Sequence, residues 1–396
     1  LSYMSGRPLM PVSPSRFALF YALYFALLGC IAPFWGLYLK HLSFTAVEIG
    51  SLMALFGVVR ILAPNMWAAQ SRRFRGPVQM VRMAGLLTLI CFSLIYMTQS
   101  YFGVAAVMIA YGFFWAAMLP QYEVLCMQSL SNQVDRYSRV RMWGSVGFIV
   151  SVVLLGAVLQ ALSISVLPAV MWALMFCIVG NAWLMPHVNH PVKPDSPTDQ
   201  QFWRRLLQGP VAGFILLNVL LQLSFGPYYT FFSIYLEEAG YSASLTGVIW
   251  GVGVIAEVIL FWQFGRIMHL LSWRAWIVLS LALTAVRWTL TGYLIGSLWV
   301  LLLLQILHAF SFGVMHAVSM RYVQALFPDH LQGRAQALYS SVSFGLGGAV
   351  GAWVSGLLWE PLGGTLVFVL AGGASVAGAV VAWLSLSPDE QRQSRQ

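Results

Sequence analysis

Apolar runs of helix length recur along the whole chain and are separated by polar connections. A bilayer core about 30 Å thick needs about 20 apolar residues in a helix, and the ten-residue alternation typical of barrel strands does not occur here. The pattern therefore predicts an all-α membrane protein with twelve transmembrane helices. We place the spans at residues 17–39, 47–68, 80–97, 102–125, 140–161, 166–185, 211–236, 245–264, 276–294, 298–317, 335–358 and 365–386.

Composition supports this class. The 396 residues are 60% hydrophobic and only 8% charged, whereas about a quarter of the residues in soluble proteins are charged. The four cysteines lie singly in apolar segments, without the spacing of a metal site or a disulfide framework, and no GxxxxGK[ST] phosphate loop occurs. We expect no cofactor, no metal and no nucleic-acid partner.

The distribution of positive charge predicts the topology. Every even-numbered connection is basic, while the odd-numbered ones hold only Lys40, so the positive-inside rule places both termini in the cytoplasm. Residues 1–16 are polar and the following run has full spanning length, so we expect no cleavable signal peptide. The basic connections contain Arg72, Arg73, Arg75, Arg82, Arg136, Arg139, Lys193, Arg204, Arg205, Arg266, Arg274, Arg321 and Arg334.

The chain also divides into two related halves. Residues 187–210 form a proline-containing polar linker, which separates an N-terminal half at 1–186 from a C-terminal half at 211–396. With an offset of 197, residues 38–62 align on 235–259, and Arg60 falls on Glu257. An offset of 196 sets GSVGF at 144–148 on SSVSF at 340–344. Two parallel six-helix repeats resemble the organisation of the major facilitator superfamily.

Few ionisable side chains lie inside the predicted spans. Glu257 is the most notable, because an acid in the apolar run LTGVIWGVGVIAEVILFW costs roughly 2.5 kcal/mol or more and so indicates function. Counting along the helices at about 1.5 Å per residue puts Glu123, Arg141 and Glu257 roughly 13 Å inside the cytoplasmic boundary. Arg287 and His308 share a second depth near the midplane. The remaining two are Arg60 and His316.

These groups leave alternatives open. Two acids and one arginine at one depth could exchange a proton, or Glu123 and Arg141 could form a static ion pair between two helices. His308 could relay protons, since its unperturbed pKa is about 6.5, or it could be a hydrogen-bonded packing residue, the reading we favour for His316. Arg60 could attract an anionic substrate or balance the charge of an acid.

Aromatic side chains near the charged layer are candidates for substrate contacts. Most aromatic residues of membrane proteins anchor the interfaces or face lipid, so proximity to the charged residues is the criterion that we apply. The candidates are Tyr111, Trp115 and Trp143.

Several segments resemble the phenylpropionate permease family of the major facilitator superfamily. They are YSRVRMWGSVGF at 137–148, GYSASLTGVIWGVGVIAEVILF at 240–261, VRW at 286–288, QILHAFSF at 305–312 and MRYV at 320–323. The resemblance implies a proton symporter for aromatic monocarboxylates such as 3-phenylpropionate in the bacterial inner membrane.

The chain is more distantly similar to the oligosaccharide:proton symporters of the lactose permease type. That resemblance implies a substrate-binding role for Arg141, with Glu123 and Glu257 as the acids, and a coupling role for Arg287 and His308. Ser311 stands where that type carries a proton-binding glutamate. The loop at 65–74, NMWAAQSRRF, keeps the basic half of the usual superfamily pattern without its acidic partner.

We therefore predict a monomeric, proton-coupled importer of a small organic solute, most consistent with an aromatic monocarboxylate, and not an enzyme. The alternatives are a sugar or nucleoside symporter, a drug:proton antiporter, or a membrane sensor with a transporter fold. The residues predicted for proton coupling are Glu257, His308 and Glu123. Those predicted for substrate binding are Arg141, Glu123, Arg60, Arg287, Trp115, Trp143 and Tyr111.

Overall fold

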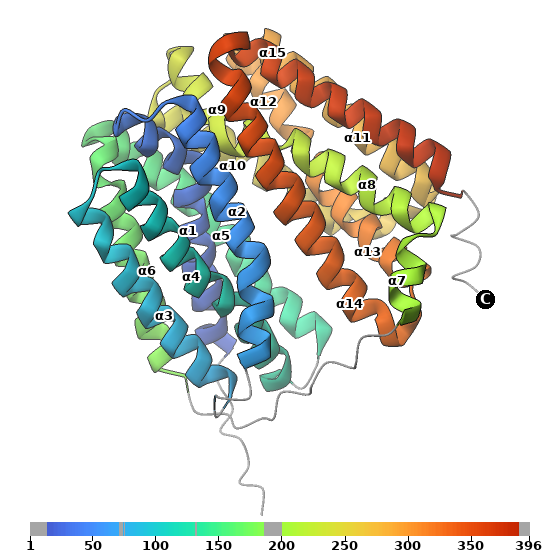
Figure 1. Cartoon of the computed structure of the whole chain (residues 1–396), viewed down its shortest axis with the longest axis horizontal. Coiled ribbons are helices and arrows are strands. Elements are labelled where there is room, and N and C mark those ends of the chain that lie inside the picture. The colour runs from blue at the N-terminus through green and yellow to red at the C-terminus, as the bar shows by residue number, and fades with distance from the viewer. Residues whose placement is uncertain (1–13, 71–73, 75, 131–132, 186–199, 388–396) are drawn as a thin grey trace, which may run out of the picture. The chain divides into compact units, whose positions relative to one another are not determined.

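The computed structural model describes residues 14–70, 74, 76–130, 133–185 and 200–387, and all regular elements in this part are helical (Figure 1). The chain forms two compact units. The first contains residues 1–28, 62–148 and 168–194, and the second contains 29–61, 149–167 and 195–396. The second unit thus includes the end of the first helix and the start of the next. The predicted division at 187–210 stays a prediction, since residues 186–199 lie outside the described part.

The first six long helices correspond to the first six predicted spans. Helix α3 begins at Pro77, where the missing amide proton of proline costs no hydrogen bond, and it continues into a short 3₁₀ turn, η2 (Leu94–Met97). The six are α1 (Pro14–His41), α2 (Ala46–Gln70), α3 (Pro77–Ser93), α4 (Tyr101–Ser129), α5 (Val134–Ala161) and α6 (Leu167–Trp183).

The remaining spans are more interrupted. Helix α7 (Gln200–Leu206) precedes α8 (Gly209–Ser224) and α9 (Gly226–Glu238), which divide one predicted span between them. Ser242 and Ser272 cap the next two long helices through their hydroxyls. Those helices and their successors are α10 (Ala243–Ile267), α11 (Trp273–Tyr293), α12 (Leu298–Ile306), the π-helix η5 (Ala309–Val314), α13 (Met315–Leu326), α14 (Asp329–Ser340), the π-helix η6 (Ser341–Gly347) and α15 (Gly348–Ser385).

The last two predicted spans lie in one helical segment that is kinked at Gly363. By length and composition the described residues contain eleven candidate spans, and the last of them runs over 56 residues from His330 to Ser385. At about 1.5 Å per residue this segment is far longer than a bilayer core about 30 Å thick. Gly363 interrupts it with a φ of 76°, a left-handed conformation suited to glycine, and Figure 1 shows the chain doubling back within α15. The segment therefore supplies two crossings.

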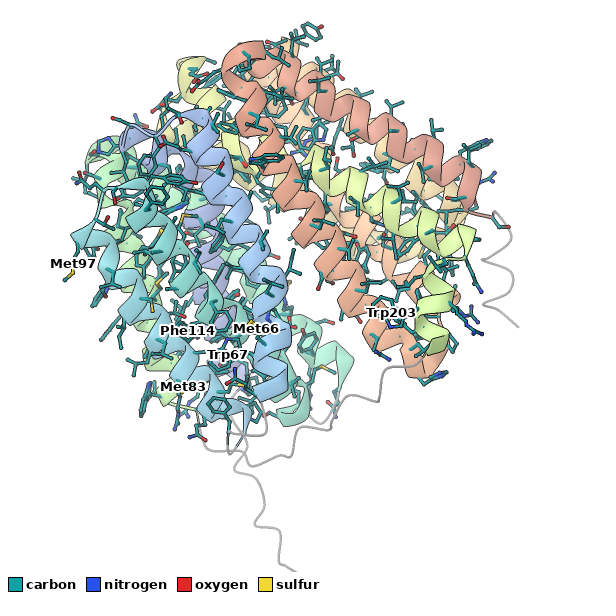
Figure 2. The ribbon with its side chains drawn as sticks, in the orientation of Figure 1. Met66, Trp67, Met83, Met97, Phe114 and Trp203 are labelled. Atoms are coloured by element: carbon teal, nitrogen blue, oxygen red, sulfur yellow. The ribbon has the colours of Figure 1, made fainter. Side chains whose placement is uncertain are left out.

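Large apolar side chains lie on the outside of the helices as well as inside. Met83 and Met97, both in the candidate span Pro77–Met97, are 37% and 84% exposed, and Figure 2 labels both. In water such exposure would be costly, whereas in a bilayer the outer surface of a span faces acyl chains, and a helix satisfies its backbone polar groups internally. The multi-pass membrane class thus explains the exposed residues.

Two aligned glycines lie at close helix contacts within the second unit. A Cβ atom on Gly50 of α2 would lie 2.7 Å from the Cα of Gly356 in α15. Its repeat counterpart, Gly247 of α10, lies against the backbone of Val152 in α5. Small residues let helix backbones approach closely in membranes. Equivalent residues of the predicted repeats thus make equivalent kinds of contact.

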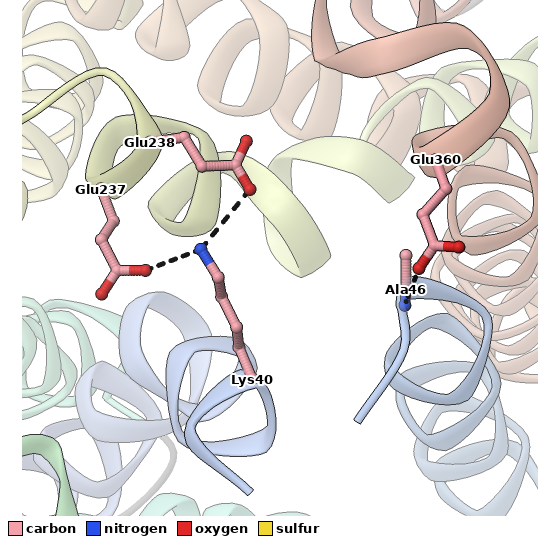
Figure 3. Close-up of polar contacts among 5 residues, drawn as sticks. All are labelled: Lys40, Ala46, Glu237, Glu238 and Glu360. Atoms are coloured by element: carbon pink, nitrogen blue, oxygen red, sulfur yellow. Dashed lines mark hydrogen bonds and ion pairs between the residues drawn. The ribbon is translucent and has the colours of Figure 1, made fainter. Parts of the chain in front are cut away.

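Opposite charges join the ends of α1 and α9 in the same unit. Lys40 Nζ lies 2.9 Å from Glu237 Oε2 and 3.4 Å from Glu238 Oε1 (Figure 3). Glu237 is the residue that aligns with Lys40 at the offset of 197. Nearby, the backbone amide of Ala46, at the start of α2, donates to Glu360 Oε1 of α15 at 3.1 Å. Both contacts connect the predicted N-terminal half to helices of the C-terminal half.

We expect Lys40→Gln to lower the free energy of unfolding by less than about 1 kcal/mol, because exposed ion pairs are weak. The side chains of Lys40 and Glu237 are 38% and 55% exposed. Salt should destabilise the wild type slightly more than the variant, and Lys40→Arg serves as the charge-preserving control. Chemical unfolding of the purified protein at low and high salt measures both effects. A loss above about 2 kcal/mol would contradict the weak-pair interpretation.

Candidate functional site

Four polar side chains from three helical segments meet in the interior of the second unit. Glu257 comes from α10, Arg287 from α11, Gln305 from α12 and His308 from the turn that follows α12. Gln305 and His308 are three residues apart, a spacing that puts side chains on one face of a helix. The sequence thus directs both of them toward the same neighbouring helices.

The four groups form a connected chain of polar contacts. Arg287 Nη1 lies 3.1 Å from His308 Nδ1, and Arg287 Nη2 donates to Gln305 Oε1 at 3.0 Å. Tyr228 of α9 donates its hydroxyl to the same Gln305 oxygen at 3.0 Å. At the other end of the chain, His308 Nε2 lies 3.5 Å from Glu257 Oε2. A titratable pair is therefore linked directly to a buried arginine.

The chemistry of arginine sets the orientation of its two neighbours. A guanidinium group can only donate hydrogen bonds, so the atom that faces it must be an acceptor. His308 Nδ1 is consequently the unprotonated nitrogen of the ring, and the proton of the neutral imidazole lies on Nε2, toward Glu257. By the same argument the Gln305 atom beside Arg287 is the carbonyl oxygen, which leaves the Gln305 NH₂ group pointing elsewhere.

Arg287 is fully buried and surrounded by aromatic rings. Its guanidinium carbon lies 4.3 Å from the centre of the Trp288 ring and 4.6 Å from that of Tyr228, with Phe225 at 6.0 Å. Such rings attract cations through their faces. None of the ion pairs formed by described residues includes Arg287, and neither its Nε nor Gln305 Nε2 has a hydrogen-bond partner there. The buried cation thus has neutral hydrogen-bond partners.

Ser311, at the position where the lactose permease type carries its glutamate, belongs to a hydroxyl network. Its Oγ donates to the carbonyl of Leu307 at 3.1 Å and accepts from Thr284 Oγ1 at 2.9 Å. A hydroxyl in this setting neither gains nor loses a proton in the working pH range. The carboxylate nearest to His308 is therefore that of Glu257.

A second charged pair lies in the first unit. Arg141 Nε of α5 is 3.7 Å from Glu123 Oε1 of α4, and the two side chains are 33% and 37% exposed. The Arg141 guanidinium also lies 4.2 Å from the centre of the Phe25 ring and 5.2 Å from that of Tyr21. Arg141 thus has both an acidic partner and aromatic neighbours, in contrast to Arg287.

The other predicted site residues are distributed more widely. Trp115 is buried and stacks on Tyr24 with ring centres 4.9 Å apart, and Tyr111 is buried against Phe92. These two are core residues of the first unit. Trp143 is 50% exposed on α5, and Arg60 is an exposed residue of α2.

Glu257 was predicted at the depth of Glu123 and Arg141, but it contacts His308, which was predicted at the second depth. Glu123 pairs with Arg141, whereas Glu257 Oε2 lies 3.5 Å from Nε2 of the neutral His308. The depth predicted for Arg287 and His308 agrees with their hydrogen bond. Gln305 was absent from the predicted site, although its position three residues before His308 could have pointed to it.

The family model described as MFS_1 like family matches residues 15–370. The chain belongs to this family. It is 30% identical over 361 residues to a probable 3-phenylpropionic acid transporter of Escherichia coli, covering 89% of this chain and 93% of the relative. Together with this relative, the chain belongs to the phenylpropionate permease family of the major facilitator superfamily. It is a transporter.

Further relatives agree on the fold. A maltose permease of Geobacillus stearothermophilus is 26% identical over 92% of each chain. Among solved structures, the nucleoside transporter NupG superposes with a TM-score of 0.83 at 16% identity, covering 94% of this chain and 98% of that one. This MFS_1 like transporter therefore has the all-α major facilitator fold and takes a small-molecule substrate.

For the Glu123–Arg141 pair of this transporter we expect a weak interaction. A double-mutant cycle of Glu123→Gln and Arg141→Gln should give a coupling of about 0.2–1 kcal/mol, because both side chains are one-third exposed and partly screened. Unfolding of the four proteins in detergent measures it. A coupling above about 2 kcal/mol would indicate a static strut between α4 and α5.

Proposed function

We propose that this transporter is a proton-coupled symporter that imports a small aromatic monocarboxylate, such as 3-phenylpropionate, across the bacterial inner membrane. The observation that carries the proposal is the chain Glu257–His308–Arg287, in which a group able to bind a proton is joined to a buried cation. The named substrate of the relative from Escherichia coli supports the aromatic acid.

The proposed cycle uses Glu257 as the proton site. Its side chain is 16% exposed, so water can reach it, while the carboxylate still touches His308. Protonation from the periplasm would accompany substrate binding, and the two predicted halves would then rock about the site and open it to the cytoplasm. Loss of the proton inside would reset the carrier. The proposal also includes cytoplasmic termini and a monomeric state.

External alkalinisation tests the proposal directly. De-energised cells that express the protein receive a pulse of 3-phenylpropionate, and a symporter draws protons inward with the substrate, so the pH of the weakly buffered medium rises. We expect this response for aromatic carboxylates and none for disaccharides or nucleosides. Cells that carry the empty vector provide the background. Uptake of labelled 3-phenylpropionate without any pH change would reject proton coupling.

A sugar or nucleoside symporter is the second candidate. The similarity to a maltose permease and to the nucleoside transporter NupG favours it, since both relatives carry hydroxylated substrates by name. Aromatic rings and an amide such as that of Gln305 also suit hydroxylated rings. Alkalinisation by maltose or uridine, and not by 3-phenylpropionate, would select this candidate.

A further inference from the structure

Resting on the proposed function, we infer that Arg287 and Gln305 anchor the carboxylate of the substrate, and that the charge of this carboxylate makes Glu257 take up one proton. Substrate and proton would then bind as a neutral pair. The inference moves the anchor from Arg141, which the family resemblance indicates, to a residue of the second unit.

Arg287 and Gln305 carry unused hydrogen-bond donors. Arg287 Nε and Gln305 Nε2 are buried and have no hydrogen-bond partner among the described residues, although the two side chains are joined through Gln305 Oε1. A buried donor without a hydrogen bond is unfavourable, and more so when it belongs to a charged group. A carboxylate has two oxygens that accept such N–H groups, and it is an anion that guanidinium groups bind specifically.

The two candidate arginines, Arg141 and Arg287, differ in their acidic neighbours. Arg141 has Glu123 at 3.7 Å, so a substrate carboxylate there would have to compete with an acid that is already present. Arg287 has no such competitor within ion-pair distance in the described structure, and its neighbours His308 and Gln305 are neutral acceptors. A substrate carboxylate therefore gains more at Arg287.

The net charge of the site changes when a carboxylate binds. With His308 neutral, Arg287 and Glu257 together carry no net charge. Tyr228 and Tyr229, which face the same region, are neutral phenols, and Arg60, whose charge acts on Tyr229, lies at an exposed position of α2. A bound carboxylate would leave one uncompensated negative charge in a buried site, which is costly, and protonation of Glu257 removes it.

His308 connects the two events. Arg287 holds its Nδ1 as an acceptor, so the imidazole donates through Nε2 to Glu257 as long as this acid is ionised. Once Glu257 is protonated, its carboxyl group is neutral and no longer depends on the hydrogen bond that His308 donates. This arrangement assigns the transported proton to Glu257 and a positioning role to His308.

The test counts protons during binding. Titration calorimetry of the purified full-length protein with 3-phenylpropionate, in two buffers of different ionisation enthalpy, should show uptake of about one proton per bound carboxylate. The uncharged analogue 3-phenylpropanamide should bind at least about tenfold more weakly, without proton uptake. Uptake of the same number of protons with the amide would overturn the inference that the charge of the carboxylate causes Glu257 to take up a proton.

Variants then locate the anchor. Arg287→Gln should reduce affinity for 3-phenylpropionate about 10- to 100-fold, the loss of one or two charge-assisted hydrogen bonds, and should leave the amide unaffected. Arg141→Gln is the matched control and should keep the preference for the carboxylate. If Arg287→Gln does not fold, Gln305→Glu provides an internal acid beside Arg287 that should exclude the carboxylate and still admit the amide.

The outcomes separate the inference from the proposed function. Loss of the preference in Arg141→Gln, with its retention in Arg287→Gln or Gln305→Glu, would overturn the inference and leave a proton-coupled carboxylate carrier intact. Wild-type protein that binds neither compound, or binds 3-phenylpropionate without alkalinisation in cells, would reject the proposed function itself.

Discussion

Glu257→Gln is expected to abolish concentrative uptake and to retain exchange of substrate between equal pools. An amide cannot bind a proton in this pH range, yet it has nearly the shape of the acid and can still accept the hydrogen bond of His308. With one proton coupled to each anion, each unit of pH difference across the membrane supports about tenfold accumulation in the wild type. The variant should level off at an accumulation ratio of about one.

The measurement uses proteoliposomes with an inside pH about two units above that outside, where the wild type should reach about 100-fold accumulation of 3-phenylpropionate. Glu48→Gln is the matched control. Glu48 is also an acid on a spanning helix, but its carboxylate accepts hydrogen bonds from the amide and the hydroxyl of Thr45 at the exposed start of α2. Loss of both accumulation and exchange in Glu257→Gln would replace the coupling role by a binding role.

Gly351→Ala is expected to lower the stability of the second unit by about 1–3 kcal/mol. Helix α15 crosses α8 and α9 at Gly351, and a Cβ there would lie 3.0 Å from the Cα of Leu223 and closer still to its carbonyl oxygen. From the other side, a Cβ on Gly226 would lie 2.6 Å from the Cα of Gly351. Backbone atoms cannot rotate away as side chains do, so the helices must separate, at about 1–3 kcal/mol.

Gly348→Ala tests this explanation on the same helix. Nothing lies within 4 Å of a Cβ at Gly348, and alanine favours a helix by up to about 1 kcal/mol over glycine. Thermal unfolding in detergent should therefore show Gly348→Ala at or above the wild type, with Gly351→Ala clearly below it. Equal stability of the two variants would mean that the close backbone contact at Gly351 does not determine the stability of the second unit.

The amino-acid sequence by itself determined the membrane class and the spans. In lipid every backbone polar group must be satisfied within a helix, so long apolar runs have one structural solution, and a fixed rise per residue converts position into depth. That reasoning placed Arg287 and His308 at one level, where the structure joins them. It also separated two crossings on either side of Gly363, where the structure has a kink.

Only the tertiary structure decided which groups at these depths meet. Depth says nothing about the rotation of a helix around its own axis or about its neighbours, so Glu257 could have been assigned to Arg141 as well as to His308. The packing of α10 against the turn after α12 selects His308. The spacing of Gln305 from His308 is a local signal, but its role follows from the donor-only chemistry of an arginine on another helix, and the packing of α11 against α12 makes that contact.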